Sequence, residues 1–98
     1  MENVIARVEL HSASYADYEN LHIYMQQRGY ARVVKGSDHK TYQLPNGTYV
    51  GSSSSPAAAL QSAVAAANAT GKTSSVIVAD WKSANWHGLP VARAARTA

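Results

Sequence analysis

The chain has 98 residues, a mass of 10.5 kDa and a formal net charge of +3, with its Lys and Arg residues scattered singly. This length fits one small domain, and because much of the 46% hydrophobic content is Ala, we expect a thin core. The absence of Cys excludes disulfide frameworks, thiolate zinc sites and cysteine nucleophiles. No apolar run approaches a membrane span and no secretory signal is visible, which predicts a cytoplasmic protein without membrane contact.

The chain begins with a strand pattern and then a helix pattern. Residues 4–10 alternate apolar with other side chains, which predicts a strand with one buried face. Ser14 is the expected N-cap of a helix that ends at Gly29. His22 lies on the inner stripe of this helix, so we expect a half-buried, hydrogen-bonded core histidine there.

Two further strand patterns follow the first helix. Residues 30–35 and 39–44 predict an antiparallel hairpin joined by the short Gly-Ser-Asp segment 36–38. The Pro-Asn-Gly sequence at 45–47 turns the chain again. Residues 48–50 then either extend the sheet or cross it.

The second half of the chain contains one helix pattern and one strand pattern. A Ser-Pro start predicts a helix over residues 56–69, followed by a Gly stop. Residues 75–81 form a nearly continuous β-branched run, which predicts the last strand. Residues 91–98 are predicted to be a flexible basic C-terminal tail, which leaves residues 1–90 as the single domain.

The predicted element order is β-α-β-β-α-β, which indicates an α+β protein. We expect a ferredoxin-like sandwich in which a four-stranded antiparallel sheet carries both helices on one face. The other face stays open and, by alternation, presents Ile5, Arg7, Glu9 and, at the strand end, His11. A thin core gains stability when a second subunit covers such a face, so we also expect a homodimer.

The His, Asp and Glu residues show neither metal-ligand spacing nor a pair of neighbouring carboxylates. The sequence therefore predicts no metal site and no cofactor. His11 is either a structural or solvated residue or an imidazole that reaches a ligand on the open face. Glu9 either pairs with Arg7 or a neighbouring Lys, or takes part in chemistry.

Basic and aromatic side chains are the candidates for contact with nucleic acid, because cations neutralise phosphates and aromatic rings stack on unpaired bases. The Gly- and aromatic-rich motif of an RNA recognition module is absent. A purely solvated surface remains an alternative. The candidate residues are Arg7, Arg28, Arg32, Lys35, Lys40, Tyr42, Tyr49 and Trp86.

Several short motifs together resemble those of a known family. These motifs are Arg7-Val8-Glu9-Leu10-His11, Asp17-Tyr18, Leu21-His22 with Met25, Tyr42-Gln43-Leu44-Pro45 and Trp86-His87-Gly88-Leu89-Pro90. With them, residues 4–90 resemble the GhoS-type antitoxins of type V toxin–antitoxin systems. The resemblance implies a ferredoxin-like fold similar to that of small CRISPR-associated nucleases. It also implies an endoribonuclease that cleaves the messenger RNA of a small membrane toxin.

The first strand ends differently from that of the CRISPR-associated nucleases, which carry an Asp there. This chain has Glu9, Leu10 and His11 instead, which favours metal-independent attack by the ribose 2′-hydroxyl. The base is then His11 or Glu9, with Arg7 or Arg28 stabilising the phosphate charge. The alternative is a non-enzymatic dimeric module that binds protein or RNA. The expected RNA-binding residues are Arg28, Arg32, Lys35, Lys40 and Tyr42.

Overall fold

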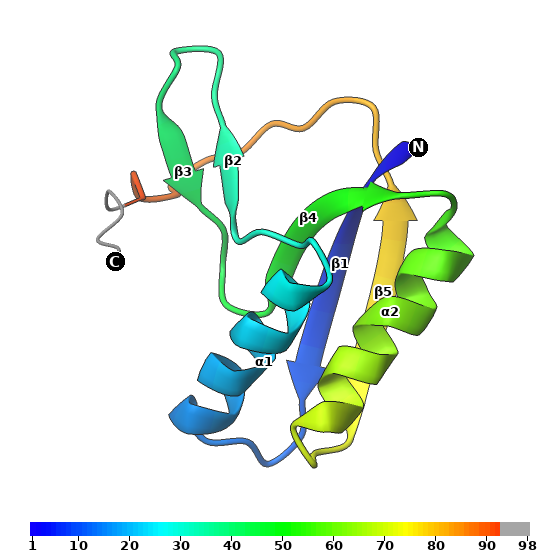
Figure 1. The fold of residues 1–98 in the computed structure, drawn as a ribbon. Helices are drawn as coiled ribbons and strands as arrows, with labels where there is room; N and C mark the ends of the chain where they lie inside the picture. The colour runs from blue at the N-terminus through cyan, green and yellow to red at the C-terminus, as the bar shows by residue number, and fades with distance from the viewer. Residues whose placement is uncertain (93–98) are drawn as a thin grey trace.

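The computed structural model describes residues 1–92 and combines two helices with antiparallel sheets (Figure 1). The elements are β1 (Glu2–Leu10), α1 (Tyr15–Gln27), β2 (Val33–Lys35), β3 (Thr41–Gln43), β4 (Thr48–Ser53), α2 (Pro56–Ala69) and β5 (Ser74–Asp80). The protein is therefore of the α+β class, as the sequence predicts.

The main sheet has three antiparallel strands in the order β4-β1-β5, so β1 is its central strand. Ile5 lies opposite Val50 of β4 and Ala79 of β5, and Arg7 lies opposite Ile77 of β5. Because directly opposed residues point to the same side of a sheet, these five side chains share one face.

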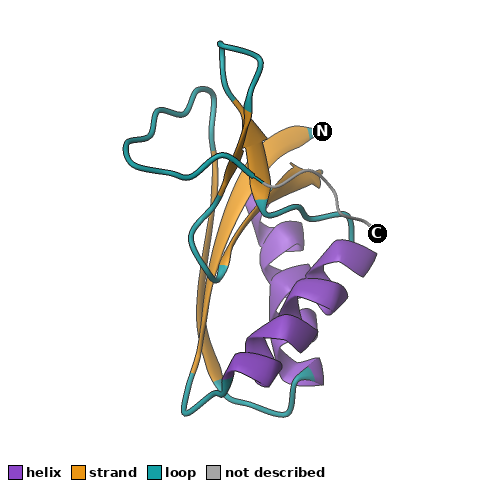
Figure 2. Ribbon diagram, turned by 90° about the vertical axis from the view of Figure 1, so that its left-hand side faces the viewer, coloured by secondary structure: helices purple, strands orange, loops and turns teal. Residues whose placement is uncertain are grey.

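Both helices cover the other face of the main sheet (Figure 2). The alternation in β1 is confirmed, because Val4, Ala6, Val8 and Leu10 are buried against the helices. The core is as thin as the composition predicts, since the fully buried residues of α2 are all Ala. They are Ala59, Ala63, Ala66 and Ala67.

The two helices begin where the sequence places them. Ser14 and Asp17 form a reciprocal capping box at the start of α1, with the backbone amide of each residue bonded to the other's side chain. Ser55 caps α2 by accepting a hydrogen bond from the amide of Ala58, and Pro56 occupies the first turn.

The main sheet has three strands rather than the predicted four. The predicted hairpin forms, but as a separate two-stranded sheet of β2 and β3, and β4 takes the place beside β1. The reason is burial: Tyr49 of β4 is 0% exposed, whereas neither β2 nor β3 contains a fully buried side chain to pack under the helices. The hairpin touches the main sheet through Ala31, which exchanges two backbone hydrogen bonds with Val50.

The segment after β5 runs back to the hairpin. The amide of Gln43 donates to the carbonyl of Pro90, and Val91 forms a bridge with Tyr42. The predicted tail starts at this paired Val91, and its residues 93–98 lie outside the described part of the chain. Neither described helix is long and apolar enough to cross a membrane.

Candidate functional site

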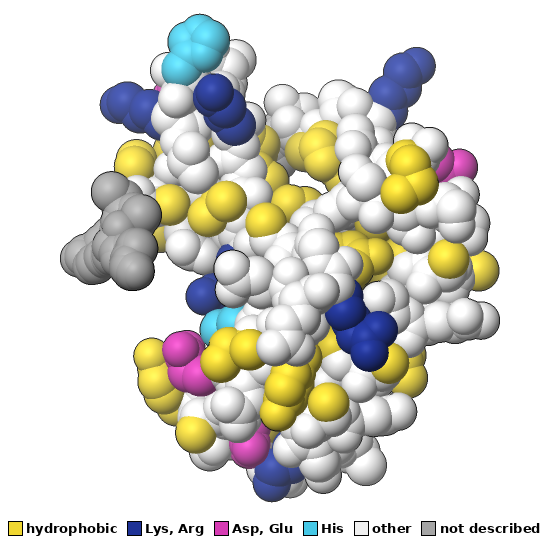
Figure 3. Space-filling view, in the orientation of Figure 1, with side chains coloured by type: hydrophobic (Ala, Val, Ile, Leu, Met, Phe, Trp, Pro, Cys, Tyr) yellow, Lys and Arg dark blue, Asp and Glu magenta, His cyan; other side chains and the backbone are white. Residues whose placement is uncertain are grey.

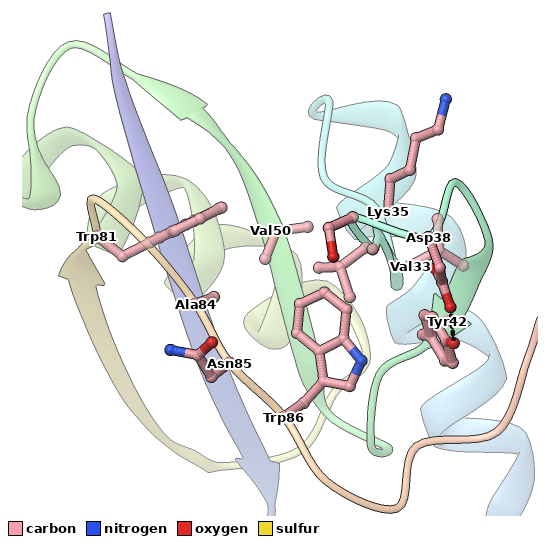
Figure 4. Close-up of a pocket in the computed structure, with 12 residues that line it drawn as sticks. Val33, Lys35, Asp38, Tyr42, Val50, Trp81, Ala84, Asn85 and Trp86 are labelled. Atoms are coloured by element: carbon pink, nitrogen blue, oxygen red, sulfur yellow. Dashed lines mark hydrogen bonds between the residues drawn. The ribbon is translucent and has the colours of Figure 1, made fainter.

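A groove of about 710 Å³ lies between the hairpin, the helix-free side of β4 and the segment that follows β5 (Figure 4). Its apolar and aromatic lining includes Val33, Val50, Tyr42, Trp81 and Trp86, and Lys35 is at its rim. Lys or Arg side chains flank the hairpin tip in the space-filling view from the helix-covered side (Figure 3), and the groove lies on the opposite, helix-free side. We call this feature the aromatic groove.

The rings of Tyr42 and Trp86 form one wall of the aromatic groove. Their centroids are 5.6 Å apart and their planes are tilted by 53°. The Tyr42 hydroxyl donates a hydrogen bond of 2.6 Å to Asp38, which lowers the pKa of Asp38 and raises that of Tyr42. Gly36 makes this close approach possible, because a Cβ there would lie 2.8 Å from Asp38 and 3.0 Å from the Tyr42 ring.

Trp81 adds a second indole to the aromatic groove. Its backbone amide donates to the carbonyl of Asn3, so the pairing with β1 continues one residue beyond β5. Its indole Nε1 is buried and finds no hydrogen-bond partner among the described residues. The indole of Trp81 adds an aromatic surface to those of Tyr42 and Trp86, a lining that suits a planar ligand.

The helix-free face of β1 presents the three residues predicted to carry chemistry. Arg7, Glu9 and His11 follow each other at alternate positions, and all three are exposed. Nδ1 of His11 lies 2.9 Å from the Thr73 hydroxyl, and Nε2 lies 2.9 Å from the Ser75 hydroxyl. Both ring nitrogens are thus engaged by hydroxyl groups that can donate or accept, so the imidazole is held in place at the end of β1.

His11 and the aromatic groove lie at opposite ends of β1. The groove borders Val50, which is paired with Ile5, and His11 follows six residues later. At the rise of a strand this separation is roughly 20 Å. The fold of one chain therefore does not bring the predicted catalytic residues into contact with the aromatic lining.

The hairpin carries three of the five predicted RNA-binding residues. Lys35 and Tyr42 line the aromatic groove. Lys40 is exposed on the loop between β2 and β3, and its amide donates to Asp38. The structure thus gathers Lys35, Lys40 and Tyr42 around one feature.

The two predicted arginines and one predicted aromatic residue lie elsewhere. Arg28 is the C-cap of α1, on the helix-covered side. The charge of Arg32 acts on the half-buried His22 and the buried Tyr49, and the Nε of Arg32 is buried without a partner among the described residues. Tyr49 is fully buried and presents no ring to a ligand, which corrects its place among the candidates for base stacking.

Sequence reasoning missed the contributions of Trp81, Thr73 and Ser75. In the sequence, Trp81 is only the last residue of a β-branched run. Its position in the alternation of the strand does, however, place its side chain on the open face of the sheet, which marks it as a candidate for ligand contact. The partners of His11 come from the start of the last strand, more than 60 positions away, and local patterns do not report such a pairing. Among residues 1–92, no three His, Asp or Glu side chains cluster so as to hold a metal ion.

The chain was also compared with known proteins. No family model matches the sequence, and neither the curated proteins nor the solved structures contain a significant match.

Proposed function

We propose that the protein binds single-stranded RNA on the helix-free side of its main sheet and cleaves it, as an antitoxin of the GhoS type that acts on a toxin messenger RNA. The observation that carries this proposal is the aromatic groove, where Trp81, Trp86 and Tyr42 stand beside Lys35. Unpaired bases stack on aromatic rings, and a cation at the rim neutralises the adjoining phosphate.

The exposed side chains of β1 give the RNA a path away from the groove. Arg7 lies between the groove end of β1 and His11 on the same face, so it is placed to contact a phosphate of a strand that follows β1. Residues Arg28 and Arg32 are not part of this surface. The proposed RNA-binding set is therefore Lys35, Lys40 and Tyr42 with Trp81 and Trp86, together with Arg7 on β1.

His11 is the proposed general base. It accepts the proton of a ribose 2′-hydroxyl, the 2′-oxygen bonds to the adjacent phosphorus, and the bond from phosphorus to the 5′-oxygen breaks. The products are a 2′,3′-cyclic phosphate and a 5′-hydroxyl, with the leaving oxygen taking up a proton. Arg7 stabilises the charge that develops on the phosphate, and Glu9 lies two residues from His11 on the same face.

Binding of a short fluorescent single-stranded RNA tests this proposal. Trp86→Ala should weaken binding by roughly 5- to 150-fold, the range that corresponds to the loss of one stacked base. Tyr15→Ala is the matched control, because Tyr15 is an 81% exposed aromatic residue on the helix-covered side. Lys35→Ala should reduce the slope of the logarithm of the binding constant against the logarithm of the salt concentration by about one. Binding that is unchanged by both groove variants would contradict the proposal.

We also propose that the architecture is a ferredoxin-like sandwich in which the fourth strand is reduced. The support is the antiparallel bridge between Ala31 and Val50, which stands at the outer edge of β4 where a fourth strand would pair. The order β5-β1-β4 followed by Ala31 then matches the arrangement expected for a βαββαβ chain.

A non-enzymatic protein-interaction module is the second candidate. It is favoured by the apolar side chains on the helix-free face, where Ile77 is 69% exposed and shares the face with Ile5 and Val50. If purified protein neither binds nor cleaves RNA, this candidate becomes the leading one.

A further inference from the structure

The outer edge of β5 is an unpaired strand edge. In the sheet order β4-β1-β5, β5 pairs with β1 on one side, and no other strand or bridge among residues 1–92 pairs with it. Natural edge strands are usually protected by Lys, Pro or a bulge. Ser74–Asp80 contains neither Lys nor Pro, its register with β1 is unbroken, and its only charge is the terminal Asp80.

The backbone hydrogen bonds of β1 show which β5 groups point outward. The amide of His11 donates to the carbonyl of Thr73, and the amide of Trp81 donates to the carbonyl of Asn3. In an antiparallel pair, residues that bond to the neighbour alternate with residues that do not. The odd-numbered residues of β5 therefore bond to β1, and the even-numbered residues direct their N–H and C=O groups to the free edge. These even-numbered residues are Ser74, Val76, Val78 and Asp80.

The outward groups are arranged symmetrically about Ile77. We propose that a second copy of this chain pairs with β5 edge to edge, antiparallel, with the two-fold axis at Ile77. In this register Val76 exchanges two backbone hydrogen bonds with Val78 of the second copy. Ser74 likewise exchanges two with Asp80 of the second copy. Ile77 faces its own counterpart in the pair type that brings side chains closest, which covers an apolar residue that is 69% exposed in one chain.

The charges near β5 permit this register. Asp80 lies opposite a Ser, and no charged residue of the strand faces a like charge. Just beyond the strand ends, Lys72 of one copy lies opposite Lys82 of the other. The ammonium of Lys72 is already 3.7 Å from the Asp17 carboxylate, which offsets the repulsion between the two lysines.

The paired edge also brings the two halves of the proposed RNA site together, a consequence that rests on the proposed function. One residue beyond the pair of Ser74 and Asp80, the same register places Thr73 opposite Trp81 of the second copy. Thr73 holds His11, and Trp81 lines the aromatic groove. The helix-free faces of the two sheets become continuous. His11 of one copy then lies two strand spacings, about 10 Å, from Trp81 of the other copy, compared with roughly 25 Å from its own Trp81.

The mass in solution tests the interface without any RNA. Light scattering at micromolar concentration should give twice the 10.5 kDa chain mass. Ile77→Lys places like charges directly opposite each other and should weaken self-association by roughly 100-fold or more. Ile23→Lys is the matched control, since Ile23 is a half-exposed residue of α1, and it should leave the mass unchanged. A monomer at these concentrations, or a dimer that Ile77→Lys leaves intact, would overturn the proposal.

Mixing two variants tests the composite site. His11→Ala and Trp81→Ala proteins should each be nearly inactive in RNA cleavage. Mixed together they should recover about a quarter of wild-type activity, because half of the dimers are mixed and each mixed dimer has one intact site. No recovery from an active wild-type protein would show that each site lies within one chain. A dimer that is sensitive to Ile77→Lys but never cleaves RNA would retain the interface and contradict the proposed function alone.

Discussion

The hydroxyl of Tyr49 lies 2.6 Å from Nδ1 of His22, in a pair that joins β4 to α1 beneath the helices. Burial raises the pKa of Tyr49, so its hydroxyl stays protonated and donates a hydrogen bond to the imidazole. Burial, with the positive charge of Arg32, lowers the pKa of His22, although Glu19 acts in the opposite direction from 3.8 Å. The pair is therefore built around a neutral histidine.

This pair makes the stability of the fold dependent on pH. Because the folded state lowers the pKa of His22, the unfolded chain binds its proton more readily. The stabilisation is complete above the unfolded pKa of about 6.5 and is lost as the pH falls below it toward the folded value. The free energy of unfolding in urea, measured between pH 8 and about 5.5, should decrease with this profile. His22→Asn should flatten the profile, and an equally steep fall in that variant would contradict the assignment.

Tyr49→Phe removes the donor of the same pair while it keeps the buried ring. The imidazole Nδ1 then loses its partner, which should cost roughly 1–3 kcal/mol of unfolding free energy. Tyr15→Phe, at an exposed position, serves as the control and should change stability little. Chemical denaturation at pH 7.5 measures both. An equal effect of the two substitutions would show that the hydrogen bond contributes nothing.

The buried stripe of β1 and the two caps were predictable because local periodicity reports which face of an element is buried. His22 was likewise expected to be a hydrogen-bonded core histidine, and the structure confirms this. The four-stranded sheet was not confirmed, because the number of strands depends on whether the hairpin or residues 48–53 pair with β1. Tyr49 decides this competition through tertiary packing, and residues 48–50 alone do not reveal it.

Gly47 is required where the chain turns into β4. Its φ is 82°, and an added Cβ would press directly on the carbonyl oxygen of Val8. Gly71 has nearly the same φ, 84°, but an added Cβ there meets nothing within 4 Å. Gly71→Ala should therefore cost only the roughly 1–2 kcal/mol of the left-handed conformation. Gly47→Ala should lose about 1–3 kcal/mol more through overpacking, measurable by urea unfolding. Equal losses would mean that the turn relaxes freely.

Cleavage by the proposed mechanism has a defined chemical signature. RNA cleavage should persist in EDTA, leave a 2′,3′-cyclic phosphate, and stop when the cut site carries a 2′-deoxyribose. His11→Ala should slow cleavage roughly 10²- to 10⁴-fold with little change in RNA affinity. His39→Ala, on the hairpin loop, is the matched control. Activity that disappears in EDTA but survives His11→Ala would assign the chemistry to a metal held by acids such as Glu9.

The candidate site was predictable in part. Strand alternation placed Arg7, Glu9 and His11 on one open face, and the structure has them there. The gathering of Trp81 with Tyr42 and Trp86 was not predictable, because it depends on the path of the chain after β5. That path is fixed by backbone bonds to the hairpin at Gln43, which carry no signal in side-chain periodicity.

The weak attachment of the hairpin separates the evolution of the groove from that of the core. Its backbone pairs within itself, with the segment near Val91, and with the main sheet through Ala31. Substitutions or insertions at its tip, for example at Ser37 and Asp38, therefore leave the hydrogen bonds of β1 intact. The hairpin wall of the groove can therefore change in sequence while the core of the main sheet is kept. Ligand preference can then diverge among descendants of this chain without loss of the fold.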